Sequence, residues 1–177
     1  NQILGEEGND FLYAGTGNDT IHGGEGIDII NGGDGTNDIY GDAGNDYLTG
    51  GNGINRLFGG SGNDILEGGT GLNLLKGTDT NTMLSDEVDT LIGNPDARQN
   101  TFYIGDNTRN WYSANGGNDY AQIVNFNPVT DIILGGVNIE AHNLITQTFL
   151  WAGGELIAKI EGLWASQLQD QFPTRIF

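Results

Sequence analysis

The chain has 177 residues, with 6 Lys plus Arg against 24 Asp plus Glu, and a formal net charge of −18. This charge repels nucleic acid and anionic membranes, so binding to either is not expected, whereas cations are attracted. The chain has 31 glycines and no cysteine, so no disulfide stabilises it, and no apolar run is long enough to span a membrane.

The first half of the chain is a series of nonapeptides. From Gly5 the sequence divides into GEEGNDFLY, AGTGNDTIH, GGEGIDIIN, GGDGTNDIY, GDAGNDYLT, GGNGINRLF, GGSGNDILE, GGTGLNLLK and a decayed ninth, GTDTNTMLS. Position 4 is glycine in the first eight: Gly8, Gly17, Gly26, Gly35, Gly44, Gly53, Gly62 and Gly71. Position 8 is Leu or Ile in all nine, and position 6 is Asp or Asn in the first eight. A flexible linker is disfavoured because it would lack this fixed apolar position.

Each nonapeptide predicts six turn residues followed by a three-residue strand whose central side chain points inward. Two repeats then form one coil of 18 residues, with strands on opposite sides. Stacked coils give two parallel sheets with strands about 4.8 Å apart. The predicted fold is therefore all-β: a parallel β-roll, a two-sheet right-handed solenoid, over residues 1–85.

Stacking brings the position-6 side chains of alternate repeats close together. Two carboxylates about 5 Å apart repel by roughly 1 kcal/mol in bulk water, and more near a protein surface. A divalent cation between them reverses the sign, and calcium accepts 6–8 oxygen ligands in flexible geometry. Magnesium requires a tighter octahedron, and zinc would need clustered Cys or His, which the sequence lacks. A calcium-free solenoid is the alternative, but it would have no need for Asp.

The two turn edges differ in charge. Odd repeats carry Asp10, Asp28, Asp46 and Asp64 at position 6, whereas even repeats carry Asp19, Asn37, Asn55 and Asn73. We predict these residues as calcium ligands, together with main-chain carbonyls near the position-4 glycines. The odd edge is expected to bind tightly and the even edge weakly or incompletely, with Asp34 as partial compensation.

These repeats resemble the RTX (haemolysin-type calcium-binding) family over residues 5–85. The resemblance implies a module that folds on binding extracellular calcium and forms the C-terminal export region of a larger secreted protein. The implied partners are calcium and the type I secretion machinery, and the implied location is extracellular or at the cell surface. Because the chain opens inside a repeat, an upstream domain is expected to precede it.

Residues 86–177 predict a β-rich C-terminal cap. The segments 89–94, 100–106, 116–126 and 127–136 read as strands with turns. QTFLW and ELIAKI, joined by AGG, predict a hairpin, and residues 163–172 predict a short helix. Asp119 and Asp89 are candidate additional metal ligands, and for both Asp119 and Asp131 a turn role is favoured over ligation.

This second region resembles the C-terminal part of proteins exported by type I secretion. In that pattern an Asp precedes the Phe that corresponds to Phe126, where this chain has Asn125. Its apolar end, FPTRIF, is similar to many such signals, but the acidic residue of one subgroup is missing. A segment here would also cover the open end of the solenoid, which otherwise exposes core and strand edge.

One outer face of the predicted roll is apolar. Its stripe consists of position-7 residues from odd repeats: Phe11, Ile29, Tyr47, Ile65 and Met83. The stripe predicts either an ordinary cross-strand ladder or a docking surface for the C-terminal segment, a protein or a neutral glycan. A glycan-binding or adhesion module is the alternative function, with Tyr13, Tyr40 and Phe58 as aromatic contacts.

Catalysis by this chain is not expected. His22 and His142 have no Ser, Cys or carboxylate partner at a recognisable spacing and are expected as solvated surface residues. The carboxylates follow the repeat register, which favours metal binding over acid–base chemistry. Any catalytic activity would reside in the missing upstream domain.

Overall fold

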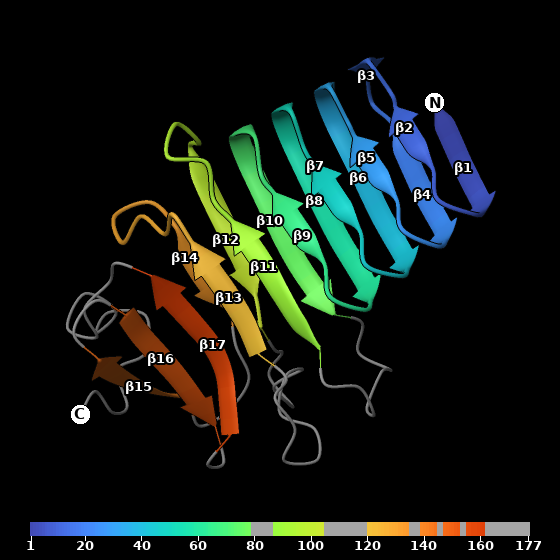
Figure 1. Ribbon diagram of the computed structural model, residues 1–177. Helices are drawn as coiled ribbons and strands as arrows, with labels where there is room; N and C mark the ends of the chain where they lie inside the picture. Colours follow the sequence, from blue (N-terminus) through green and yellow to red (C-terminus); the bar gives the residue numbers. More distant parts are fainter. Residues whose placement is uncertain (79–86, 105–119, 135–138, 145–146, 153–154, 162–177) are drawn as a thin grey trace.

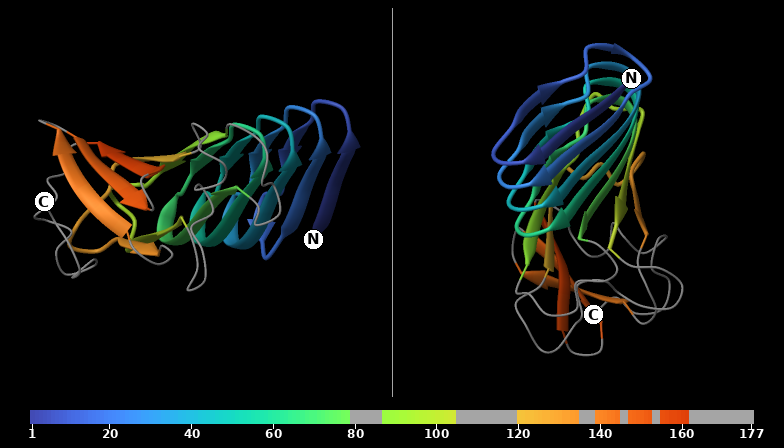
Figure 2. Two further views of the ribbon diagram at one scale, coloured as in Figure 1. Left: turned by 90° about the horizontal axis from the view of Figure 1, so that it is seen from below. Right: turned by 90° about the vertical axis from the view of Figure 1, so that its right-hand side faces the viewer.

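The computed structural model describes residues 1–78, 87–104, 120–134, 139–144, 147–152 and 155–161. Within these residues every regular element is a strand. The chain winds in successive coils from one end of the molecule to the other (Figure 1). The coils place two sheets face to face along the stack (Figure 2). The predicted all-β class with two parallel sheets is confirmed.

The first sheet is parallel throughout. Its strands, in spatial order, are β1 (Gln2–Glu7), β4 (Thr20–Glu25), β6 (Asp34–Ala43), β8 (Asn52–Ser61), β10 (Thr70–Thr78), β12 (Gln99–Tyr103) and β14 (Ile132–Leu134). The short β3 (Thr16–Gly17) also pairs with β6. Strands β6 and β8 have 10 residues each, longer than the expected three, because turn residues on both sides of the expected strand join the ladder.

The second sheet is parallel over most of its width. It runs through β2 (Phe11–Tyr13), β5 (Ile29–Asn31), β7 (Tyr47–Thr49), β9 (Ile65–Glu67), β11 (Val88–Ile92), β13 (Tyr120–Val124) and β17 (Glu155–Glu161). Two antiparallel strands, β16 (Gln147–Ala152) and β15 (Ile139–Leu144), complete it. The predicted hairpin of β16 and β17 is confirmed.

The core is two rows of aliphatic side chains, one from each sheet. Position-8 residues from Ile21 to Leu75 are fully buried because this position faces the inside of every coil. Both rows continue beyond the nonapeptides through Leu91, Phe102, Ile123, Ile133 and Ile160. At the other end, Ile3 and Leu12 of the first coil are only partly buried.

Glycine at position 4 lets the coils stack closely. Gly44 has φ +138, a conformation that side chains disfavour. A Cβ placed there would lie 1.6 Å from the carbonyl oxygen of Gly26 in the preceding coil. Any other residue would therefore both strain the backbone and separate the coils.

The change of sequence pattern at residue 85 does not interrupt the two sheets. Strand β11 pairs in parallel with β9, and β12 pairs in parallel with β10. The predicted strands of residues 89–134 are present as β11 to β14. The helix predicted at 163–172 lies outside the described residues. Among the residues that the structure describes, no helix is long and apolar enough to cross a membrane.

Candidate metal edge

The position-6 side chains point into the coil. Positions 6 and 8 lie two residues apart on an extended segment, so their side chains share the inner face. Asp28 and Asp64 are fully buried and Asp46 is 2 % exposed, deeper than unpaired carboxylates normally lie. We call the row Asp10, Asp28, Asp46, Asp64 and Asp89 the aspartate edge.

Along the aspartate edge, one carboxylate oxygen accepts a hydrogen bond from the neighbouring coil. Oδ1 accepts a hydrogen bond from the main-chain N–H of the preceding aspartate of the row. The donor–acceptor distances are 2.8 Å for Asp10 to Asp28, 2.8 Å for Asp28 to Asp46, 2.9 Å for Asp46 to Asp64 and 2.9 Å for Asp64 to Asp89. These bonds fix the carboxylates in register, one per coil.

The other carboxylate oxygen is left without a donor. Within the described residues, Oδ2 is buried and accepts no hydrogen bond in Asp10, Asp19, Asp28, Asp46 and Asp64. A buried ionised carboxylate without full compensation is strongly unfavourable. Each of these oxygens therefore requires a positive charge or a proton.

Main-chain carbonyls lie beside these oxygens. A Cβ placed on Gly23 would be 2.2 Å from Asp28 Oδ2 and 2.7 Å from the carbonyl oxygen of Gly41. The same test at Gly59 gives 2.3 Å to Asp64 Oδ2 and 2.6 Å to the oxygen of Gly77. In each turn a carboxylate oxygen and a main-chain carbonyl oxygen thus flank the same glycine, and both are atoms of the kind that calcium takes as ligands.

Burial raises the proton affinity of two members of this row, Asp46 and Asp64. It raises the pKa of Asp64 to about 8, and the charges of Asp89, Asp46 and Glu87 act in the same direction. Burial likewise raises the pKa of Asp46 to about 6, although its bond from the Asp28 N–H opposes the shift. The ionised row is therefore poorly tolerated unless a cation neutralises it.

Within the described residues, the candidate metal ligands along the aspartate edge are all oxygen atoms. No group of three or more His, Cys, Asp and Glu gathers around one point in the described part of the chain. The aspartates are instead spaced one per coil, so main-chain carbonyls would have to complete any coordination shell. Carboxylate plus carbonyl oxygen is the ligand chemistry that calcium accepts and zinc disfavours.

The carbonyl ligands near the position-4 glycines remain a prediction, and the carbonyl oxygens of two turn positions have different surroundings. The oxygens of position-4 glycines such as Gly8 and Gly26 lie against the position-4 glycine of the next coil. The carbonyls beside the unpaired Oδ2 atoms belong to position 1, as in Gly41 and Gly77.

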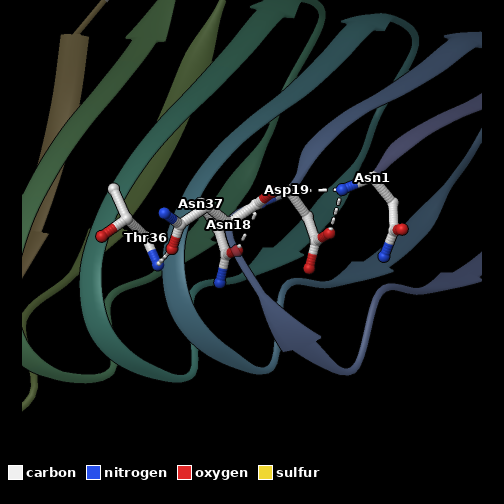
Figure 3. A network of polar contacts seen from close by, with 5 residues as sticks. All are labelled: Asn1, Asn18, Asp19, Thr36 and Asn37. Atoms are coloured by element: carbon white, nitrogen blue, oxygen red, sulfur yellow. Dashed lines mark hydrogen bonds and ion pairs between the residues drawn. The ribbon is translucent and has the colours of Figure 1, made fainter.

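The opposite turn edge has amides in the same register. We call the row Asn37, Asn55, Asn73 and Asn100 the asparagine edge; all four are buried. Asp19 precedes this row, and its Oδ1 accepts a bond from the amino group of Asn1 at 2.6 Å. Figure 3 shows Asp19 between Asn1 and Asn37, whose Oδ1 accepts the Asp19 N–H at 3.2 Å. Asp34 is exposed and accepts a bond from Asn52, so it does not enter the buried row.

Several residues of these rows were not predicted. Asn1 occupies position 6 of a half repeat that precedes Gly5, a pattern visible as N-x-I-x. Asn100 extends the second row, although a long insertion hides its register in the sequence. Asp131, for which a turn role was predicted, accepts the Asn127 N–H within its own turn and also adjoins Asn100 at the end of this row. Glu87, 5 % exposed, accepts bonds from Gly62 N–H and Thr78 Oγ1 without any repeat signal. Asp119 lies outside the described residues, and Ala121 occupies the register position after Asp89.

The apolar stripe is exposed. Phe11, Ile29, Tyr47 and Ile65 form one cross-strand row on the second sheet, and none is covered by the described residues. Met83 lies outside those residues. The Phe11 side chain, 75 % exposed, is the most accessible of the four.

An aromatic stack lies on the outer face of the first sheet. Tyr40 is stacked between His22 and Phe58, with ring centroids 4.5 and 4.8 Å apart. His22 also bonds to Asp42 Oδ2 at 2.9 Å. His22, expected as a solvated surface residue, is partly exposed, and it also has these lateral neighbours, which the local sequence did not indicate. His142 lies in β15, and its side chain is outside the description.

Comparison with known proteins agrees with this geometry. A family model described as the RTX calcium-binding nonapeptide repeat, with four copies of the repeat, matches residues 1–30, 13–48 and 40–75. No curated protein matches the chain.

Proposed function

Because residues 1–75 belong to the RTX calcium-binding nonapeptide repeat family, we propose that this calcium-binding module also drives folding and export of a larger secreted protein. RTX nonapeptide repeats bind calcium ions. The observation that supports a folding role is the row of buried Oδ2 atoms without donors on the aspartate edge. A chain that buries these groups on folding is poorly stable until they are neutralised.

The proposed mechanism couples folding to metal binding. Asp28, Asp46 and Asp64 hold their oxygens toward the neighbouring turn, and the carbonyls of position-1 glycines face the same space. Calcium would supply the positive charge and coordination that these oxygens lack. Without it, repulsion within the row and the entropy of 31 glycines favour the unfolded chain.

Export and location follow from this coupling. RTX repeats are typical of secreted, extracellular proteins, where calcium is abundant. An unfolded chain in low cytosolic calcium would suit passage through the type I secretion machinery, and external calcium would then fold it. In this proposal the chain itself performs no catalysis.

A calcium titration followed by far-UV circular dichroism tests the proposal, with magnesium as the control ion. We expect a coil-to-strand transition with calcium alone. Asp28→Asn should raise the calcium concentration at the midpoint, whereas Asp34→Asn, an exposed control, should leave it unchanged. A chain that is fully β in excess chelator would contradict calcium-coupled folding.

The exposed stripe favours a second candidate function, an adhesion or glycan-binding module attached to an enzyme or cell-surface protein. Phe11, Tyr13 and Tyr47 are exposed on the second sheet, where they could contact a neutral glycan or a protein. Tyr40 and Phe58 are less suitable, because their ring faces are covered by stacking. Binding on a glycan array in calcium, lost in Phe11→Ala, would support this function.

A further inference from the structure

We infer that the asparagine edge holds its turns together without calcium, because side-chain amides supply there the donors that a cation replaces on the aspartate edge. The inference deepens the proposed function, since it states which turns of the roll take up metal. The comparison between the two edges rests on the proposed calcium binding at the aspartate edge. The hydrogen bonds of the asparagine edge do not depend on it.

Each amide of the asparagine edge donates in two directions. Its Nδ2 donates to the carbonyl oxygen of the position-2 glycine in its own turn, at 3.5 Å for Asn37, 3.3 Å for Asn55 and 2.7 Å for Asn73. The same Nδ2 donates to Oδ1 of the next amide of the row, at 3.3, 3.3 and 3.0 Å. Both hydrogens of each amide are thereby used, in a continuous ladder that crosses the coils.

The equivalent atom is unpaired on the aspartate edge. Asp46 and Asn55 occupy position 6 in adjacent repeats, and both are buried. Their side chains have the same shape, but Asp46 presents a second acceptor where Asn55 presents an NH₂ donor. Asp46 Oδ2 has no donor among the described residues, whereas Asn55 Nδ2 has two acceptors. The identity of this one atom, Oδ2 or Nδ2, therefore determines whether the turn needs a positive charge or has its hydrogen bonds satisfied.

The ends of the asparagine edge follow the same logic. At the far end, Asn100 Nδ2 lies 3.2 Å from both carboxylate oxygens of Asp131, whose Oδ1 also accepts the Asn100 N–H at 2.8 Å. The Asn127 N–H donates to Asp131 Oδ2 at 3.0 Å, so this buried carboxylate is supplied with donors. At the near end, Asp19 Oδ2 has none within the described residues. The need for metal thus depends on the residue type at position 6, and at Asp19 the Asn1 ammonium already supplies a positive charge to Oδ1.

Counting bound calcium in the full chain tests the inference. We expect equilibrium dialysis to show one more ion per chain in Asn55→Asp than in the wild type, because the new Oδ2, which replaces Nδ2, faces the Gly51 carbonyl and Asn73 Oδ1 without a donor. Asn55→Asp should also need more calcium to fold. Gln2→Glu, an exposed amide-to-carboxylate control on β1, should change neither quantity, and Asp28→Asn should bind one ion fewer.

Two results would overturn the inference: an unchanged calcium count and folding midpoint in Asn55→Asp, or loss of an ion in Asn55→Ala. If the variants fail to fold, amide exchange in the wild type decides. The side-chain NH₂ protons of Asn37, Asn55 and Asn73 should exchange far more slowly than that of exposed Asn52, and equal rates would contradict the ladder. A wild type that binds no calcium at all would refute the proposed function but not the ladder, which the exchange rates test separately.

Discussion

At the scale of single residues, the second terminal atom of the position-6 side chain, oxygen in Asp and nitrogen in Asn, determines whether a turn lacks a hydrogen-bond donor. An oxygen there is left without a donor in Asp28, while a nitrogen bridges two acceptors in Asn55. Buried polar atoms are normally paired, so an unpaired row repeated in register marks a functional requirement and not a local defect. Without metal, the unpaired oxygens of Asp10, Asp28, Asp46 and Asp64 therefore lower the stability of the fold. This loss makes folding depend on metal.

Protonation should partly replace metal. In chelator, the folded-state pKa of Asp64 is about 8 against an ordinary 3.8, so the folded chain binds more protons than the unfolded chain between these values. The free energy of unfolding should then fall as pH rises through this window, by at most about 1.4 kcal/mol per pH unit from this one group. Below pH 4 both states are protonated and this penalty is absent.

Far-UV circular dichroism in chelator at several pH values between 4 and 8 measures this slope as a loss of strand content, because the metal-free chain is expected to unfold as its carboxylates ionise. Asp64→Asn should flatten it, and saturating calcium should reduce it, since binding releases the proton. A free energy of unfolding that rises with pH across this window would contradict the assignment.

At the scale of the strand and turn, close stacking depends on glycines that meet the preceding coil. Gly44 and Gly8 are a matched pair at position 4, with φ of +138 and +122. A Cβ on Gly44 would lie 1.6 Å from Gly26 O, whereas nothing lies within 4 Å of a Cβ on Gly8. The two sites share the backbone strain and differ in the steric clash.

We therefore expect Gly8→Ala to cost about 1–2 kcal/mol, the strain of a left-handed backbone alone. Gly44→Ala should cost clearly more, because the coils must also separate. Urea midpoints in saturating calcium compare the two variants. Equal losses would show that the contact between coils contributes nothing.

The same scale shows what the sequence could and could not predict. A period of nine with Leu or Ile at position 8 predicted the buried rows, because inward positions of a solenoid recur with the repeat. Ten-residue strands such as β6 were not predicted, since glycine-rich turn residues lack the usual strand composition. The stacking of His22 on Tyr40 and the donors around Asp131 depend on neighbours 18 to 31 residues away, beyond any local pattern.

At the scale of the whole molecule, the net charge of −18 opposes compaction in two ways. Exposed carboxylates repel through solvent, where salt screens them: the Debye length falls from about 10 Å at 0.1 M to about 3 Å at 1 M. The aspartate edge is buried, so salt screens it poorly.

We accordingly expect 1 M sodium chloride in chelator to leave the chain expanded, whereas millimolar calcium at low salt compacts it. The hydrodynamic radius from dynamic light scattering distinguishes these states, with sodium chloride added to the calcium-bound chain as the control. Compaction by sodium chloride alone, to the calcium-bound radius, would mean that surface repulsion and not the buried row keeps the chain open.

The pairing register also limits how such a chain can change its length. Ladder partners are 18 residues apart along the regular coils, then 25, 27 and 31 apart further on. Loss of a single nonapeptide would place aspartates opposite asparagines and mix the two edges, while loss of two would rejoin each row to itself. The smallest change of length that preserves both edges is therefore a pair of repeats, and the wider spacings later in the chain still return each row to its own register.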